Sequence, residues 1–444
     1  MLQRLSLLLC TAVLAACSAS SSDPGKTEIT LMRFFGSCEA QYGQVTKASE
    51  GVGECGIVTA LVNEFNATNT DGIVVRTQIG EWGPYYDQLT ARLVAKDIPT
   101  IAVMHESALG DYVRRKLVLP LDADFARVGI DKADFTEHAA RGTSFNGQTY
   151  ALPFDTWAWL WHINTRLMKQ AGLMQADGRP VLPHSPEELL AQARQFKQRT
   201  GKPYFAWAVV NETAANDRTF LTLVAQQDAA LFSPDGKTIH MHQPAVTRAL
   251  TLMQQLYSEG LVKPNADYAA ANQAFLNGEA GVVVVGTWTI DQFLRESKKA
   301  DSPLQGGYAV VPFPQLYERP AVFADGHSWA LFKGGATDAK GHEAALKFLK
   351  FLWDHSAEWS RTGHLPVRRS VAESAAFRAL PLSEPLAEIT RTGIGMPGNV
   401  PTQRAIELLI GEDVANLMLS GKPVAEVQDS VEKRVNTALR KARR

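Results

Sequence analysis

The sequence has no excess of charge of either sign. Lysine and arginine number 45 against 46 aspartates and glutamates, and the basic tail Arg440–Arg444 is the one notable run of like charge. A mixed, near-neutral surface lacks the positive patch with which proteins bind nucleic acid, and the helix macrodipole alone favours a basic helix end. We therefore expect no nucleic-acid partner.

The sequence also lacks an apolar run long enough to span a membrane. The run Leu5–Val13 follows Arg4 and ends in Leu14-Ala15-Ala16-Cys17; it is too short for a stable transmembrane helix but has the order of a secretory signal. The Leu-Ala-Ala-Cys box resembles the bacterial lipoprotein signal, in which Cys17 carries the acyl chains. We expect a signal peptide at 1–16, a lipidated tether at 17–26, and a mature protein outside the cytoplasm, lipid-anchored to a bacterial membrane. An ordinary secretory peptide is the alternative.

Cysteine is scarce, with four in 444 residues. Cys10 leaves with the expected signal peptide and Cys17 is the expected lipid site, so Cys38 and Cys55 remain. In an oxidising compartment these two most simply form a disulfide. Two buried free thiols are the alternative that the sequence leaves open.

Catalytic motifs are nearly absent. Gly51–Gly56 matches G-x-G-x-x-G, but a dinucleotide fingerprint follows a strand directly, and this match lies in the expected disulfide loop. His240 and His242 alternate, yet nothing supplies the further ligands that a metal site needs. We expect no catalytic residue, no metal and no cofactor. A carboxylate pair for glycoside hydrolysis stays open, because its two members can be distant in the chain.

Strands and helices alternate at the start of the mature chain, which predicts a parallel sheet with right-handed crossovers. About 420 mature residues exceed what one hydrophobic core serves, so we expect an α/β chain of two domains. The expected strands are Glu28–Phe35, Gly72–Gln78, Thr100–His105, Trp157–Asn164 after a short segment at Gly147–Pro153, and the Val-rich Gly281–Gly286. The expected helices are Ile57–Asn66, Tyr85–Ala95, Pro186–Arg199, Asp217–Ala229, Pro244–Glu259, Asn272–Asn277, Glu343–Trp353 and Val424–Leu439.

Aromatic and polar residues gather in the stretch Pro153–Asn164. Alternation puts Asp155, Trp157, Trp159 and Trp161 on one side. Sugar sites combine aromatic platforms with carboxylates and amides in a preformed cleft. We assign Asp155 and Trp157 to such a cleft and the other two tryptophans to packing; three core tryptophans are the alternative.

Three motifs in this order carry a family resemblance: Leu152–Trp157, Phe275–Trp288 and Gly363–Arg368. From about Glu28 onward the chain resembles the extracellular solute-binding proteins of ABC importers, family 1, which includes maltose-, trehalose- and glycerol-phosphate-binding proteins. The resemblance implies an α/β, two-lobed periplasmic-binding-protein fold with an interlobe cleft and crossing hinge strands. It places lobe 1 at 27–155 and 310–365, and lobe 2 at 156–309 and 366–444.

The resemblance also assigns three roles in sugar contact. Trp288 resembles the sugar-stacking aromatic, Glu106 a carboxylate that accepts sugar hydroxyls, and Asp155 a second polar contact. The alternatives are a core residue for Trp288 and a helix cap or surface charge for Glu106.

Further positions have weaker support. Arg368 matches a basic residue that reaches the ligand, although it could simply pair with a carboxylate. Gly326 and His327 occupy a cleft segment of the family. Trp82, in an expected loop, either rims the cleft or covers a helix end.

The resemblance implies a non-enzymatic, monomeric protein that binds a small sugar, such as the disaccharides maltose or trehalose, and hands it to the transmembrane subunits of an ABC permease. The first alternative ligand is glycerol-3-phosphate or a glycerophosphodiester, for which Arg368 and Arg369 would supply anion contacts. Other classes left open are a secreted glycosidase and a lipoprotein with a degenerate cleft.

Overall fold

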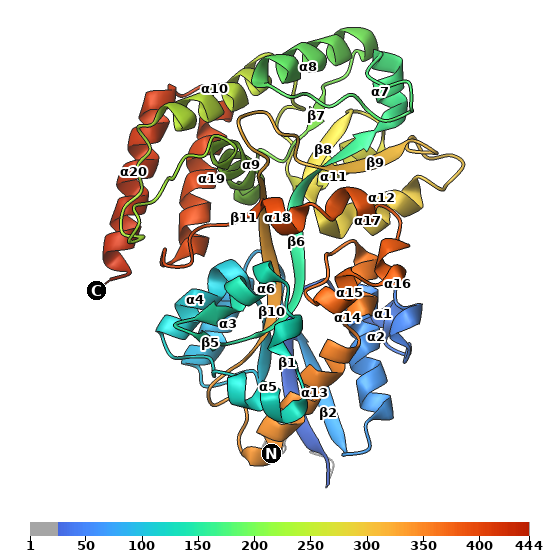
Figure 1. Ribbon diagram of the computed structural model, residues 1–444, viewed down its shortest axis with the longest axis vertical. Coiled ribbons are helices and arrows are strands. Elements are labelled where there is room, and N and C mark those ends of the chain that lie inside the picture. The colour runs from blue at the N-terminus through green and yellow to red at the C-terminus, as the bar shows by residue number, and fades with distance from the viewer. Residues whose placement is uncertain (1–24, 444) are drawn as a thin grey trace, which may run out of the picture.

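The computed structural model describes residues 25–443. Figure 1 shows two bodies stacked along the long axis, with β6 and β10 running between them. The strands lie in one sheet of order β2-β1-β3-β10-β6-β8-β7, with β9 on β6 and β11 on β10, apart from the small β4-β5 pair. The strand bounds are β1 Thr27–Arg33, β2 Ile73–Ile79, β3 Ile101–His105, β4 Ser144–Phe145, β5 Gln148–Thr149, β6 Leu152–Asn164, β7 Phe205–Ala206, β8 Val282–Gly286, β9 Tyr308–Pro312, β10 Val322–Leu331 and β11 Gly393–Ile394.

The first three strands form the expected parallel sheet, since β1 pairs parallel with both β2 and β3. Beyond β3 the pairing changes, because β10 is antiparallel to both β3 and β6. The strand expected at Gly281–Gly286 is β8, which pairs antiparallel with β6 and parallel with β7. The sequence analysis missed β10, the strand that links the sheet portions of the two bodies.

The helices cover both bodies, and those expected from the sequence are present with shifted ends. The longer helices are α2 Gly53–Thr68, α3 Tyr85–Val94, α4 Glu106–Arg114, α8 Pro186–Thr200, α9 Thr213–Ala225, α10 Pro244–Ser258, α11 Tyr268–Leu276, α13 Ala339–Asp354, α19 Gln403–Leu419 and α20 Val424–Lys441. The shorter ones are α1 Glu39–Tyr42, α5 Asp122–Val128, α6 Glu137–Thr143, α7 Thr165–Ala171, α12 Ile290–Glu296, α14 Ser356–Trp359, α15 Arg369–Ala372, α16 Ala375–Arg378, α17 Ser383–Leu386 and α18 Ile389–Thr392. The sequence analysis did not identify α19.

Two hydrophobic cores divide along the crossing strands. The lower core in Figure 1 contains residues of β1, β3, α2, α4 and α13, and ends in β6 at Phe154. The upper core begins in β6 at Trp157 and contains β8, α9, α10, α19 and α20. Phe323 of β10 belongs to the upper core, although it lies in the range 310–365 that the sequence analysis assigns to lobe 1. The division into lobes by residue number stays a prediction.

Cys38 and Cys55 form a disulfide, which confirms the pairing expected from the sequence. It joins the residue before α1 to the first turn of α2. The expected signal peptide and Cys17 lie outside the described residues. Within residues 25–443, no helix is both long and apolar enough to cross a bilayer.

Candidate functional site

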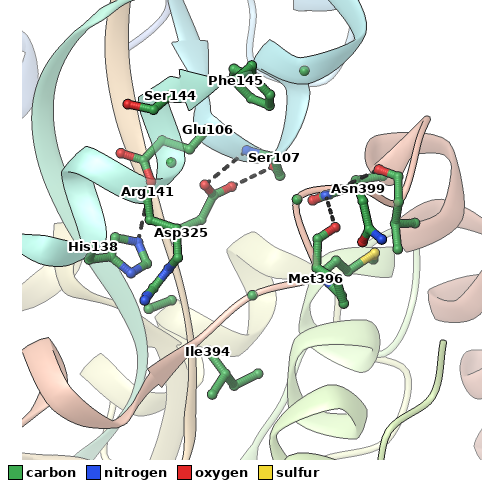
Figure 2. A pocket seen from close by; sticks show the side chains of 18 of the residues that line it. Glu106, Ser107, His138, Arg141, Ser144, Phe145, Asp325, Ile394, Met396 and Asn399 are labelled. Carbon is green, nitrogen blue, oxygen red and sulfur yellow. Dashed lines mark hydrogen bonds and ion pairs between the residues drawn. The ribbon is translucent and has the colours of Figure 1, made fainter. Parts of the chain in front are cut away.

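A cavity of about 660 Å³ lies between the two cores. One wall consists of α4 and α6, which pack in the lower core, and the other of residues 393–400 with the first turns of α19, which pack in the upper core. Figure 2 shows Glu106 and Asp325 across this space from Ile394, Met396 and Asn399. The volume falls in the range of about 300–1,000 Å³ that is typical of small-molecule sites.

Glu106 is the buried carboxyl of the α4 wall. It begins α4 directly after β3, so the strand end aims it into the cavity. Its Oε1 has no hydrogen-bond partner among the described residues, and its Oε2 lies 3.4 Å from His138 Nε2. The pKa of Glu106 is raised well above its usual value, mainly by burial and further by the charges of Asp325 and Asp155. A protonated carboxyl both donates and accepts hydrogen bonds, which suits a ligand hydroxyl.

Asp325 comes from the missed strand β10 and joins the same wall. Ser107 Oγ donates a hydrogen bond to Asp325 Oδ2 at 2.6 Å, and the backbone N–H groups of Ser107 and Gly326 donate to Oδ1. Burial is the main cause, and the charge of the nearby Glu407 the second, that raises the pKa of Asp325 to about 6. Burial lowers the pKa of the neighbouring His138 to about 4, so this imidazole is neutral at pH 7.

Gly326 is needed where β10 passes Glu106. A Cβ at this position would lie 2.6 Å from both Glu106 Oε1 and the carbonyl oxygen of Asp155. Such distances are far below van der Waals contact, so a larger residue would displace the Glu106 carboxyl. Gly326, one of the predicted site residues, therefore leaves the space in which the Glu106 carboxyl lies.

Glu407 is the charged residue of the α19 wall, and Arg404 lies beside it. Glu407 is 3 % exposed and pairs with Arg404, whose Nη1 lies 3.0 Å from Oε2. The Arg404 guanidinium lies 4.9 Å above the ring of Trp82, and that ring packs on Phe34. The predicted residue Trp82 is thus a contact between the loop after β2 and the upper body.

Arg218 of α9 is a buried cation without a hydrogen-bond partner within the described part of the chain. Its Nε is buried and unpaired, and its guanidinium lies 4.4 Å above the ring of Trp157. The same guanidinium lies 5.8 Å from the ring of Phe323, which lines the cavity. Both carboxylate oxygens of the adjacent Asp217 are also buried and unpaired. An unpaired buried polar group costs about 1–3 kcal/mol, and neither Arg218 nor Asp217 is among the residues that line the cavity.

Trp157 and Trp288 lie in contact, and Trp157 also packs on Phe323, but neither predicted tryptophan is among the residues that line the cavity. Trp157 is 1 % exposed, and its ring meets that of Trp288 edge-on at 5.5 Å. Trp288 is half-buried and donates a hydrogen bond from Nε1 to Tyr268 Oη at 2.7 Å. Tyr268 is 38 % exposed, and desolvation raises its pKa to about 12.

The predicted residues Asp155 and His327 lie in contact, but beneath the cavity rather than in its lining. Asp155 is fully buried and accepts hydrogen bonds from His327 Nδ1 at 2.9 Å and Trp359 Nε1 at 2.6 Å. Burial opposes the ionisation of Asp155, but His327 and then His364 outweigh it and lower its pKa.

Arg368 lies away from the residues that line the cavity. Its Nε pairs with Asp134 Oδ2 at 3.0 Å and its Nη1 donates to the carbonyl of Trp353 at 2.9 Å. Its guanidinium also stacks 4.5 Å above the Trp353 ring. Arg368 therefore pairs with a carboxylate, which is the alternative that the sequence left open, and does not reach the cavity.

Comparison with known proteins places this geometry in a family. The model of the family described as bacterial extracellular solute-binding protein matches residues 60–385. The chain is 25 % identical to an arabinooligosaccharide-binding protein of Bacillus subtilis over 388 residues, which are 84 % of this chain and 81 % of that protein. It is 22 % identical to a lactose-binding protein of Rhizobium radiobacter over 55 % of each chain.

Solved structures share the fold. The GacH receptor of Streptomyces glaucescens, determined unliganded and with acarbose, matches with a TM-score of 0.75 at 19 % identity, over 94 % of this chain and 99 % of that one. The sugar-binding protein MalE of Xanthomonas citri matches with a TM-score of 0.74 at 19 % identity, over 94 % and 98 %. These likenesses confirm the expected two-lobed α/β fold.

Proposed function

The chain belongs to the bacterial extracellular solute-binding proteins, and from that premise we propose that it binds a carbohydrate between its two lobes and delivers it to the transmembrane subunits of an ABC importer. The cavity between the two cores carries this proposal, because both of its walls contribute polar side chains. A ligand that contacts both walls would favour closure of the lobes about the crossing strands β6 and β10.

The lining of the cavity fits a neutral, hydroxyl-rich ligand. The lining combines the carboxyls of Glu106, Asp325 and Glu407 with the guanidinium groups of Arg114 and Arg141, so it offers both acceptors and donors to hydroxyl groups. The raised pKa of Glu106 favours a protonated carboxyl, which pairs with a hydroxyl as both donor and acceptor.

Within this class we propose a disaccharide or short oligosaccharide, with maltose and trehalose as the first candidates. The names of the relatives support the class, since they specify arabinooligosaccharides and lactose. The alternative of a glycerol phosphate has less support, because Arg368 is occupied by Asp134 and Trp353, and Arg369 donates to the carbonyl of Ala133.

A thermal-shift screen tests this function. Purified protein is heated with maltose, trehalose, lactose, an arabinooligosaccharide or glycerol-3-phosphate, each over a range of concentrations. A ligand at 100 times its dissociation constant stabilises the folded state by about 2.7 kcal/mol. We expect at least one neutral saccharide to raise the melting temperature in a saturable manner. Stabilisation by glycerol-3-phosphate alone would overturn the proposed ligand class, and turnover of a bound oligosaccharide would overturn the non-enzymatic role.

We propose that Cys17 holds the protein on the membrane through its acyl chains, each buried methylene of which contributes about 0.8 kcal/mol. The proposal rests on the Leu14–Cys17 box. Cys17→Ser should move the protein from the membrane fraction to the soluble fraction, as followed by immunoblot in cells without the permease. Continued membrane association of Cys17→Ser would contradict the proposal.

A further inference from the structure

A second cluster of ligand-type side chains lies outside the lining of the cavity. One donor atom from each of Asp155, His327 and His364 lies within 4.8 Å of the others, and all three residues are buried. Glu54 of α2 approaches the same point. The cluster gathers residues from α2, the crossing strands β6 and β10, and the loop after α14, which are far apart in the sequence.

Hydrogen bonding sets the proton position on His364. Thr362 Oγ1 donates to the carbonyl of Trp359 at 2.7 Å, so this oxygen accepts the hydrogen bond from His364 Nδ1, also at 2.7 Å. The neutral imidazole then presents a lone pair at Nε2. That atom is buried and has no hydrogen-bond partner among the described residues.

The lone pair of His364 faces two carboxylates. Nε2 lies 3.5 Å from Glu54 Oε1 and 3.8 Å from Asp155 Oδ2. Within residues 25–443, no lysine or arginine pairs with either carboxylate. Two ligands bound about 2.1 Å from one tetrahedral zinc ion are about 3.4 Å apart, so His364 Nε2 lies at close to that spacing from each of the two carboxylate oxygens.

The surroundings orient these donors as in a built metal site. Asp155 is held by hydrogen bonds from His327 Nδ1 and Trp359 Nε1, and His364 donates its other ring N–H to Thr362. Partners of this kind fix the direction of metal-binding carboxylates and imidazoles. The Glu54 side chain is 25 % exposed, which leaves a route for an ion to enter.

We propose that Glu54, Asp155 and His364 bind a divalent transition-metal ion of the Zn²⁺ type, with His327 positioning Asp155. Nitrogen and oxygen donors at this spacing suit zinc better than Mg²⁺ or Ca²⁺, which prefer all-oxygen sites. The site lies where both crossing strands meet the lower body, so a bound ion would join α2 to β6.

Zinc titration tests the site directly. The full chain, without a polyhistidine tag and after treatment with a chelator, is titrated with ZnCl₂ by calorimetry, and the bound metal is counted by elemental analysis after gel filtration. We expect one zinc ion per chain and a dissociation constant that rises at least tenfold in both Glu54→Gln and His364→Gln. His342→Gln is the matched control, because His342 lies at the surface beside Asp124.

Two outcomes overturn the proposal. One is the absence of stoichiometric zinc in the wild-type protein, in which case a proton on Glu54 fills the gap beside His364. The other is zinc affinity that is equal in the wild type, Glu54→Gln and the control. His364→Gln could fail to fold, which circular dichroism without metal would show. In that case the zinc affinity of Glu54→Gln, at a partly exposed side chain, still tests the proposal.

Discussion

The Glu106 carboxyl occupies a space that two glycines leave open. A Cβ at Gly142 of α6 would lie 1.9 Å from Glu106 Oε2, and one at Gly326 of β10 would lie 2.6 Å from Oε1. The backbones of a helix and a strand therefore enclose one carboxyl, and the side chain of a single residue depends on positions far away in the sequence.

Gly142→Ala should weaken saccharide binding at least tenfold while the fold persists. Alanine is favoured over glycine by about 1 kcal/mol in a helix interior, but its methyl group would take the position of the Glu106 carboxyl, which can swing away. Calorimetric titration and urea denaturation of the same protein separate the two effects. The control is Gly341→Ala in α13, where the nearest atom would lie at 3.5 Å. Unchanged affinity in Gly142→Ala would refute the role of Glu106.

Trp288→Ala should raise the dissociation constant for the saccharide about thirtyfold, or about 2 kcal/mol. The half-buried ring is the expected platform for the apolar face of a sugar. If Trp288 is instead a core residue, its truncation costs about 3–5 kcal/mol of folding stability with little specific loss of binding. Titration together with chemical denaturation distinguishes these results. Tyr268→Phe is the control, because it removes only the hydrogen bond to Nε1.

At the scale of elements, the sequence predicts the regular parts of the fold and misses several that build the site, namely α4, α6, β10 and α19. The strands and helices of β1 to β3 alternate with clear patterns, as expected for crossover units. Strand β10 is buried on both faces along its whole length, so it has no alternation, and Asp325, Gly326 and His327 interrupt its apolar run. Helix α19 packs on α9, α10 and α20. Because it is covered on several sides, its sequence does not have the single apolar stripe that is typical of a surface helix.

The candidate site shows the same limit. The family resemblance pointed to Glu106, which lines the cavity, whereas the roles of Trp157, Trp288 and Gly326 in binding stay predictions. Glu407 carries no local motif, and only tertiary packing brings it to the cavity. The metal-type cluster was missed for the same reason, since Glu54, Asp155 and His364 come from three separate parts of the chain.

The disulfide should stabilise the α1–α2 segment. On the chain-entropy model, a bridge across a separation of 17 residues contributes about 3 kcal/mol. We expect the Cys38→Ser, Cys55→Ser double variant to unfold at a lower urea concentration than the wild type, as measured by circular dichroism. Its free energy of unfolding should be smaller by about 3 kcal/mol. Equal unfolding midpoints for the wild type and the double variant would contradict this expectation.

At the scale of the whole molecule, buried ionisable groups collect between the two bodies and link stability to pH. The pKa of Asp325 is about 6 in the folded protein, against an ordinary value of 3.8 for an aspartate. The folded state therefore binds more protons than the unfolded state between these values, and the contribution of Asp325 to stability falls as pH rises through this window. His138, with a pKa lowered to about 4, acts in the opposite direction.

Asp325→Asn should remove the contribution of Asp325. The measured quantity is the free energy of unfolding of the wild type minus that of the variant. We expect this difference to fall by on the order of 2–3 kcal/mol as the pH rises from 4 to 7. Urea denaturation of both proteins at pH 4, 5, 6 and 7 measures this difference. Asp235→Asn is the control, because hydrogen bonds from Ser233 and Lys237 lower the pKa of Asp235 to about 2. A constant difference between wild type and Asp325→Asn would show that Asp325 has an ordinary pKa.

Calorimetric titration of a neutral saccharide into the wild type, Glu106→Ala and Glu106→Gln tests binding between the lobes most directly. Glutamine keeps both a donor and an acceptor, as a protonated carboxyl does, so Glu106→Gln should retain most of the affinity. Glu106→Ala should raise the dissociation constant at least tenfold, and the surface variant Glu343→Gln should leave it unchanged. Equal affinity in the wild type and Glu106→Ala would contradict a saccharide site in this cavity.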